Sequence, residues 1–266
     1  MKLELDQYTH LDSPLHRWHP TPKLVGFVVL IFAFAGVKSY SLLPAMLGVT
    51  LLLYWLSRLP LSYLQGRLRY PGLFLIGIVG LLPFLSGSTV IWQWGWLTVR
   101  SEGLWAALLV SSRFLAILTT SFILIGTTPF LSLIDSMRSL GLPAVLADMT
   151  LLAYRYLNDI VQSLATMQQA MRLRGFGSSS KSKKLFRING ETFRRLAFLA
   201  GTLLIRSYEQ AERVYNAMRL RGYGTRSQRQ VALRNPNRWG NAWSWAALGL
   251  MVLIAIGFFV MEWKLA

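Results

Sequence analysis

Two short stretches of this chain carry the residues best suited to gripping a charged partner. Ala170-Met171-Arg172-Leu173-Arg174-Gly175-Phe176-Gly177 recurs as Ala217-Met218-Arg219-Leu220-Arg221-Gly222-Tyr223-Gly224, and only Phe176 and Tyr223 differ. An arginine guanidinium can hold a carboxylate through two parallel hydrogen bonds, which makes it the usual anchor for an acidic group on a partner. The glycines also suit helix C-caps, and an arginine in the last turn offsets the negative helix end. Capping explains the glycines but not the retained Ala-Met-Arg-Leu-Arg-Gly, so the repeat favours a docking device with two equivalent contacts.

The two arginines within one copy are expected to have different roles. Arg172 and Arg174 are two steps apart along a helix, which separates their directions by about 200°. One of them can therefore face the rest of the protein while the other projects outward.

Each copy of the motif closes an amphipathic stretch, and these stretches must position the arginines. Apolar residues between Leu157 and Met171 recur at steps of three, four and seven, and a second stripe runs from Phe193 to Met218. Neither stretch is apolar all round, so neither should cross lipid. Each is expected to bury one face against protein or the membrane surface.

The rest of the chain has the composition of a membrane protein. Of its 266 residues 53% are hydrophobic, and the mean hydropathy is +0.41. A span needs about 20 apolar residues to cross a hydrocarbon core about 30 Å thick. Five segments are candidate spans, the second and third being short: Pro22–Val37, Leu42–Leu56, Pro71–Leu85, Leu104–Ile125 and Trp243–Met261. The sequence predicts an all-α integral membrane protein with about five spans and an amphipathic module inserted before the last.

The net charge of +17 is distributed as membrane topology requires. Most lysines and arginines fall in the N-terminal segment, in the loop Ser57–Tyr70 and in 127–238, so the positive-inside rule places these parts in the cytoplasm. Tryptophans gather at predicted span ends, as in an interfacial aromatic belt. The predicted division is 1–21, a cytoplasmic segment; 22–126, four spans; 127–238, the cytoplasmic module; and 239–266, the last span. Residues 87–103 are expected to form an outer loop or a re-entrant piece.

Two smaller features have a structural and a functional interpretation. Arg113 is the one charge deep in a predicted span, where it either pairs with a backbone carbonyl or nearby serine, or serves as a strut or partner contact. His16 and His19, near His10 and Asp12, suit a transition metal. Pro20 and Pro22 argue against a helix presenting both imidazoles, so we expect no metal site there.

The sequence offers no catalytic machinery. It has no cysteine, no convincing nucleophile–base set and no Gly-x-x-x-x-Gly-Lys phosphate loop, so we expect neither an enzyme nor an ATP-binding protein. No cleavable signal peptide is expected either.

The paired arginine motifs resemble those of the T component of energy-coupling factor transporters, whose signature is two Ala-Arg-Gly triplets at the ends of cytoplasmic coupling helices. Here the triplets read Leu173-Arg174-Gly175 and Leu220-Arg221-Gly222, so that arginine and glycine match and leucine replaces alanine. Leu15-His16-Arg17 with Pro20 and Lys23-Leu24 resembles the start of the cobalt-type members. Further landmarks of the family are Thr127-Thr128-Pro129, Leu140-Gly141-Leu142-Pro143 and Tyr154-Arg155-Tyr156.

The resemblance implies a set of partners and residue roles. Arg174 and Arg221, with Gly175 and Gly222 and with Ala170 and Ala217 for close packing, would each dock on one of two ATP-hydrolysing A components. A separate substrate-binding S component would contact the outward helix faces, for which the candidate residues are Leu157, Val161, Leu164, Leu203, Leu204 and Val214. ATP would be bound by the partners, no cofactor by this chain, and the other contacts would be membrane lipids, not nucleic acid.

The resemblance also implies a place and a cargo. The chain would lie in the plasma membrane of a prokaryote and serve uptake of a divalent metal, cobalt before nickel. A vitamin-type or shared T component is the alternative. A second alternative, from another functional class, is a self-sufficient secondary transporter. Such a protein would need polar groups at mid-membrane besides Arg113. A membrane-anchored scaffold or nucleic-acid binder would use the basic run Lys181–Arg187.

Overall fold

The computed structural model describes residues 13–85, 90–94, 97–174, 190–223 and 242–265. The chain divides into two compact units. The first, here called the membrane unit, comprises the described parts of 5–140 and 237–266. The second, here called the coupling unit, comprises the described parts of 141–236. The boundary falls at Gly141, later than the predicted 127, because the helix after Pro129 packs on the first helix of the membrane unit.

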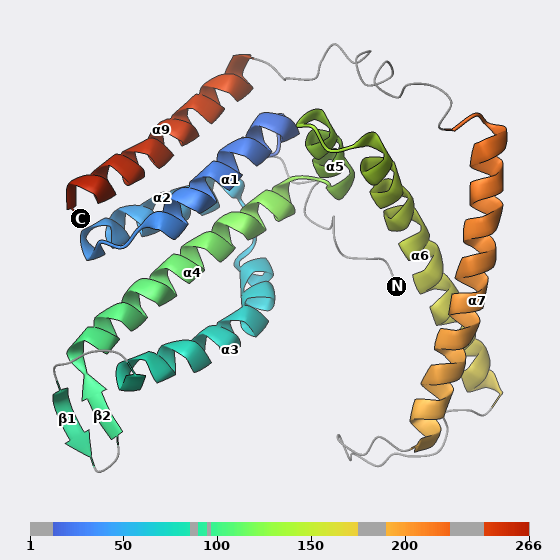
Figure 1. Cartoon of the computed structure of the whole chain (residues 1–266), viewed down its shortest axis with the longest axis horizontal. Coiled ribbons are helices and arrows are strands. Elements are labelled where there is room, and N and C mark those ends of the chain that lie inside the picture. The colour runs from blue at the N-terminus through green and yellow to red at the C-terminus, as the bar shows by residue number, and fades with distance from the viewer. Residues whose placement is uncertain (1–12, 86–89, 95–96, 175–189, 224–241, 266) are drawn as a thin grey trace. The chain divides into compact units, whose positions relative to one another are not determined.

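The membrane unit is built of helices with one small hairpin (Figure 1). Its elements are α1 Pro20–Gly36, the 3₁₀ turn η2 Tyr40–Leu42, α2 Leu43–Ser57, α3 Leu61–Leu85, β1 Val90–Trp94, β2 Leu97–Arg100, α4 Ser101–Thr127, α5 Phe130–Ser139 and α9 Ala242–Leu265. α1 packs chiefly on α9 and also on α4 and α5, while α4 packs on α2 and α3. The predicted all-α class is confirmed, with the hairpin as a small addition.

The core of the membrane unit is apolar and close-packed. Phe27, Leu30 and Phe34 of α1 are fully buried, as is Met46 of α2. The Phe34 ring meets Phe258 of α9 edge to face, with 5.5 Å between ring centroids. This geometry is a favoured one for aromatic pairs, and it joins the first helix to the last.

Within the part of the chain that the structure describes, three helical stretches are long and apolar enough to span a membrane: Tyr40–Ser57, Glu102–Thr127 and Ala242–Lys264. α1 is as apolar but shorter. The outer surfaces of α2 and α9 are apolar. Large side chains there are more than 70% exposed, namely Leu51, Trp55, Leu253 and Phe259. Such large exposed apolar faces suit a lipid environment rather than water.

The third predicted span differs in its boundaries. α3 begins at Leu61 rather than Pro71 and so takes in Arg67 and Arg69, which we had placed in a loop. No proline interrupts the stretch after Pro60 until Pro71, and so the helix can start early. Pro71 and Pro83 then lie inside α3. An internal proline removes a backbone donor and bends a helix, and α3 is visibly bent in Figure 1.

The segment we expected to be an outer loop or re-entrant piece contains a β-hairpin. β1 and β2 are antiparallel, with Trp92 opposite Val99 and Trp94 opposite Leu97. Valine, isoleucine and tryptophan are strong strand formers, and this was the signal that could have predicted the pairing.

A carboxylate of α9 holds the last helix to the connection between α1 and α2. Glu262 of α9 accepts hydrogen bonds from the backbone N–H groups of Lys38 and Ser39, both at 3.0 Å. These donors lie in the turn that joins α1 to α2. The contact closes the membrane unit at the end opposite Pro20.

A lysine is buried at the other end of α1. Lys23 is 1% exposed, and its amine donates to the carbonyl oxygens of Leu15 at 2.9 Å and Thr127 at 3.0 Å. Thr127 is the last residue of α4, where carbonyls lack helical partners. Lys23 therefore joins the N-terminal segment, α1 and the end of α4.

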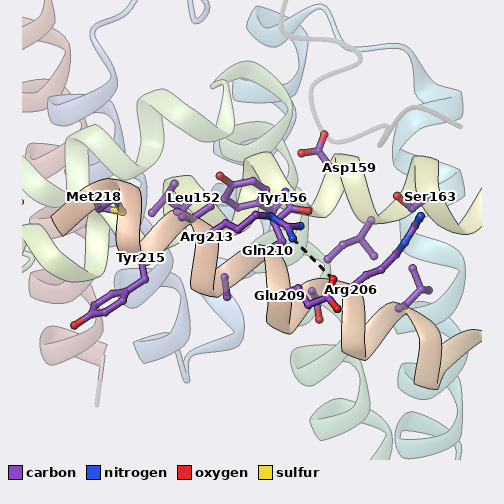
Figure 2. A pocket seen from close by; sticks show the side chains of 15 residues that line it. Leu152, Tyr156, Asp159, Ser163, Arg206, Glu209, Gln210, Arg213, Tyr215 and Met218 are labelled. Carbon is purple, nitrogen blue, oxygen red and sulfur yellow. Dashed lines mark ion pairs between the residues drawn. The ribbon is translucent and has the colours of Figure 1, made fainter. Parts of the chain in front are cut away.

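The coupling unit consists of two long helices, α6 Ala144–Leu173 and α7 Gly190–Leu220. The half-buried residues of α7 recur at steps of three and four, as a helix with one covered face requires: Leu199, Leu203, Ser207, Gln210, Val214 and Met218. Between the helices lies a groove of about 630 Å³ (Figure 2). Charged groups at the groove include Asp159 and the exposed pair Arg213–Glu209 at 3.8 Å.

Candidate functional site

The end of α7 is a glycine-capped helix terminus. Gly222 has a φ of 73°, which glycine adopts without the strain that a side chain would bring. Its N–H donates to the carbonyl of Arg219 at 3.0 Å, and the N–H of Tyr223 donates to that of Met218 at 3.0 Å. This pair of bonds is the Schellman arrangement. It confirms the capping role of Gly222 and ends the helix sharply at the motif.

The capped end of α7 is also tied to α6. The Tyr223 hydroxyl donates to Oδ2 of Asp148, in the second turn of α6, at 2.8 Å. Sequence reasoning missed this bond, although its signal was visible. Tyr223 is the one residue that departs from the first copy, where Phe176 has no hydroxyl to donate.

Next to the Tyr223–Asp148 hydrogen bond, several side chains of the motif are exposed to solvent. Arg221 and Ala217 are exposed, and Leu220 is 90% exposed. Arg221 also lines a hollow of about 600 Å³ together with Asp148, Arg155 and Tyr223. The capped end of α7 thus leaves an arginine and a leucine exposed side by side. Arginine is among the residues enriched where proteins bind one another.

The first copy ends α6 in the same way as far as it is described. The N–H of Arg174 donates to the carbonyl of Ala170 at 3.1 Å, and both residues are exposed. Leu173 is 83% exposed. Gly175 lies outside the described residues. Both helices thus end in an exposed Leu-Arg pair.

The structure separates the six candidate residues of the outward helix faces. Leu203 and Val214 line the groove between α6 and α7. Val161 and Leu164 are half-buried, whereas Leu157 is 41% and Leu204 is 70% exposed. Only Leu157 and Leu204 therefore combine an apolar side chain with substantial exposure.

Arg113 makes the backbone contact that we considered for it. Its guanidinium donates to the carbonyl oxygen of Val37, which caps the end of α1. A cation at a helix C-terminus is favoured because the unpaired carbonyls there carry partial negative charge. Arg113 therefore links α4 to α1 as an internal strut.

His16 and His19 each form a hydrogen bond with a residue close in sequence. His16 Nδ1 lies 2.6 Å from the Ser13 hydroxyl. His19 caps α1, its Nδ1 accepting from the N–H of Thr21 at 3.4 Å. His10 and Asp12 lie outside the described residues.

These features define a class: a multi-pass helical membrane protein with two amphipathic helices that end in exposed arginines. Residues 12–232 match the family model described as cobalt transport protein. The energy-coupling factor transporter transmembrane protein of Limosilactobacillus fermentum is 32% identical over 95% of each chain. Its counterpart from Brevibacillus brevis is 31% identical over 81% of this chain and 83% of its own. That of Thermanaerovibrio acidaminovorans is 27% identical over 98% and 97%.

The chain belongs to the family of transmembrane T components of energy-coupling factor transporters. It is therefore a non-catalytic subunit of a transporter, as the lack of catalytic motifs predicted.

Replacing Tyr223 by phenylalanine should loosen the second arginine end. Tyr223→Phe removes the bond to Asp148, and the loss of a hydrogen bond worth about 1 kcal/mol raises the equilibrium constant for local opening about fivefold. Amide hydrogen exchange of residues 219–223, followed by mass spectrometry, measures this opening. Tyr208→Phe removes a hydroxyl from a tyrosine of α7 that is 72% exposed, and it is the matched control. Equal exchange in both variants would show that the Asp148 bond does not hold this end.

Proposed function

We propose that this chain couples ATP hydrolysis by two partner subunits to the movement of a substrate-binding membrane subunit. The exposed Leu-Arg ends of α6 and α7 carry this proposal. Each guanidinium offers a forked set of donors for a carboxylate or for carbonyl groups on one ATPase. The neighbouring leucine, Leu173 or Leu220, adds apolar area to the same contact.

The two helices are suited to carry movement over a distance. α6 has 30 residues and α7 has 31, so each is about 45 Å long at 1.5 Å per residue. A displacement of the arginine end is passed along such a helix because its backbone is hydrogen-bonded throughout. The exposed side chains of Leu157 and Leu204 offer apolar contacts for the substrate-binding subunit.

The proposed topology follows the charge distribution. The N-terminal segment and the coupling unit lie in the cytoplasm of a prokaryote, where the ATPases are, and the helices of the membrane unit lie in the plasma membrane. ATP is bound by the partner subunits and no cofactor by this chain.

The proposed cargo is a divalent metal, cobalt before nickel. Two observations support this: the likeness of Leu15–Leu24 to the cobalt-type members, and the match to a family model described as cobalt transport protein. The names of the relatives compared above give no substrate. Selectivity would belong to the substrate-binding subunit, so the residues of this chain need not encode it.

Affinity purification of the tagged chain from native membranes in mild detergent tests the proposal. We expect two ATP-binding subunits and a small, very apolar protein to co-purify, and membranes holding this complex to take up radiolabelled cobalt on ATP addition. Uptake of a vitamin in place of cobalt would overturn the cargo alone. A homogeneous monomer that transports without ATPases would instead indicate a secondary transporter.

A further inference from the structure

The membrane unit contains an apolar groove that the coupling role does not use. It has a volume of about 410 Å³ and lies between the N-terminal segment, α1, α2 and α9. Leu15, Trp18, Leu53, Trp243, Leu250 and Ile254 are among the residues that line it.

The walls of this groove are fixed in place. The Trp18 indole N–H donates to the carbonyl oxygen of Ser244 at 3.1 Å, which ties the N-terminal segment to the start of α9. The Lys23 amine holds the carbonyl of Leu15 at 2.9 Å. Trp18 is itself buried against Phe27, at 6.2 Å between ring centroids. A groove with hydrogen-bonded walls selects its occupant better than a fluid helix surface does.

The groove is about as long, measured along α9, as one leaflet of a bilayer is thick. From Trp243 to Ile254, α9 extends about 16 Å, which is about half of a 30 Å hydrocarbon core. Trp243, 74% exposed, marks the interfacial end, where tryptophan rings prefer to lie. The length suits an acyl chain that enters from one membrane surface and stops at the midplane.

Two exposed arginines lie close in sequence to residues that line the groove. Arg17 lies in sequence between the lining residues Leu15 and Trp18, and Arg58 follows the lining residue Leu56 by two positions. Arg58 has a φ of 52°, a left-handed conformation that costs about 1 kcal/mol for a residue with a side chain. Glycine would end α2 there without that strain, so the structure keeps an arginine side chain at an energetic disadvantage.

We propose that this groove binds one membrane phospholipid with a net negative headgroup. One acyl chain lies along Leu53 and Leu250, and the headgroup phosphate sits between Arg17 and Arg58. Charge complementarity favours an anionic headgroup at this end, and arginine binds phosphate through paired hydrogen bonds. The lipid wedges between α2 and α9 and stabilises the packing of the membrane unit.

Native mass spectrometry of the full chain, with the subunits that co-purify, tests this proposal. Phosphatidylglycerol and phosphatidylcholine are titrated in separate samples. We expect one phosphatidylglycerol to be retained in preference to phosphatidylcholine. Arg17→Gln and Arg58→Gly should each weaken its retention about fivefold, the loss expected for one basic residue near an anionic lipid. Arg58→Gly should also relieve the left-handed strain, so weaker binding there does not come from unfolding.

Filling the groove tests the chain-binding half separately. Ala246→Phe places a ring in the groove from an exposed position of α9 and should abolish retention. Two matched controls should retain the lipid. Arg69→Gln removes an exposed charge away from the groove, and Ile256→Phe adds a ring at an exposed position that does not line it. Equal retention of both lipids, or equal loss in a control and its partner variant, would overturn the proposal.

Discussion

Reversing both arginine ends, in the double variant Arg174→Glu and Arg221→Glu, should release the ATPase subunits and abolish ATP-driven uptake. Truncating one partner of a buried charged contact costs about 2–5 kcal/mol, and a reversed charge adds repulsion. At about 3 kcal/mol per site, each contact weakens more than a hundredfold. Co-purification of ATPases with the tagged chain, together with uptake, measures both effects.

The repeat supplies its own control for this experiment. Arg172→Glu with Arg219→Glu changes the net charge by the same amount, on exposed residues of the same two helix turns. Helix geometry separates these side chains from Arg174 and Arg221 by about 200°, so the ATPases should remain bound. If both double variants lose the ATPases equally, the general positive charge of the module holds them, and Arg174 and Arg221 have no specific role.

The second large effect is expected at Lys23. Lys23→Met keeps the length of the side chain but leaves the carbonyls of Leu15 and Thr127 buried without their donor. Two lost hydrogen bonds and two desolvated carbonyls should cost about 3 kcal/mol or more. We expect a clear fall in the midpoint of thermal unfolding of the purified chain in detergent.

Lys38→Met is the matched control for Lys23→Met. The side chain of Lys38 is exposed, and only its backbone N–H donates to Glu262, so this variant should unfold near the wild-type temperature. Equal midpoints for the two variants would show that the buried amine contributes no net stability.

The sequence was most informative where one periodic pattern ran between two clear stop signals. The stripes ending at Met171 and Met218 predicted α6 and α7. The family landmarks Thr127-Thr128-Pro129 and Leu140-Gly141-Leu142-Pro143 contain proline and glycine, and they lie where α4 ends and just before α6 begins. Such signals are local, because helix periodicity and proline sterics act within a few residues.

Contacts between distant residues were not predictable from these patterns. Lys23 stands at the start of the predicted span Pro22–Val37, and it is buried because Leu15 and Thr127 come together around it. Glu262 caps a turn more than two hundred residues away in sequence. Tyr223 finds Asp148 across two helices. Each of these bonds depends on tertiary packing, which periodicity and residue type do not predict.

At the candidate site, the repeat predicted the capping role of Gly222, which the structure shows, and docking by Arg174 and Arg221 stays a prediction. The Tyr223 hydroxyl that holds the second end was not predicted. A single difference between two otherwise identical motifs was the available signal, and Phe176 against Tyr223 was noted without a structural reason.

Site-directed cross-linking tests the central claim most directly, since the chain has no cysteine of its own. Single cysteines at Leu173, at Leu220 and at the control position Leu253 would each carry a short photoreactive group in native membranes, with Arg174 and Arg221 left in place. We predict cross-links from 173 and 220 to ATP-binding subunits, and none of that kind from 253. Cross-links from 173 and 220 to lipid or to other copies of this chain, with the ATPases untouched, would contradict the account.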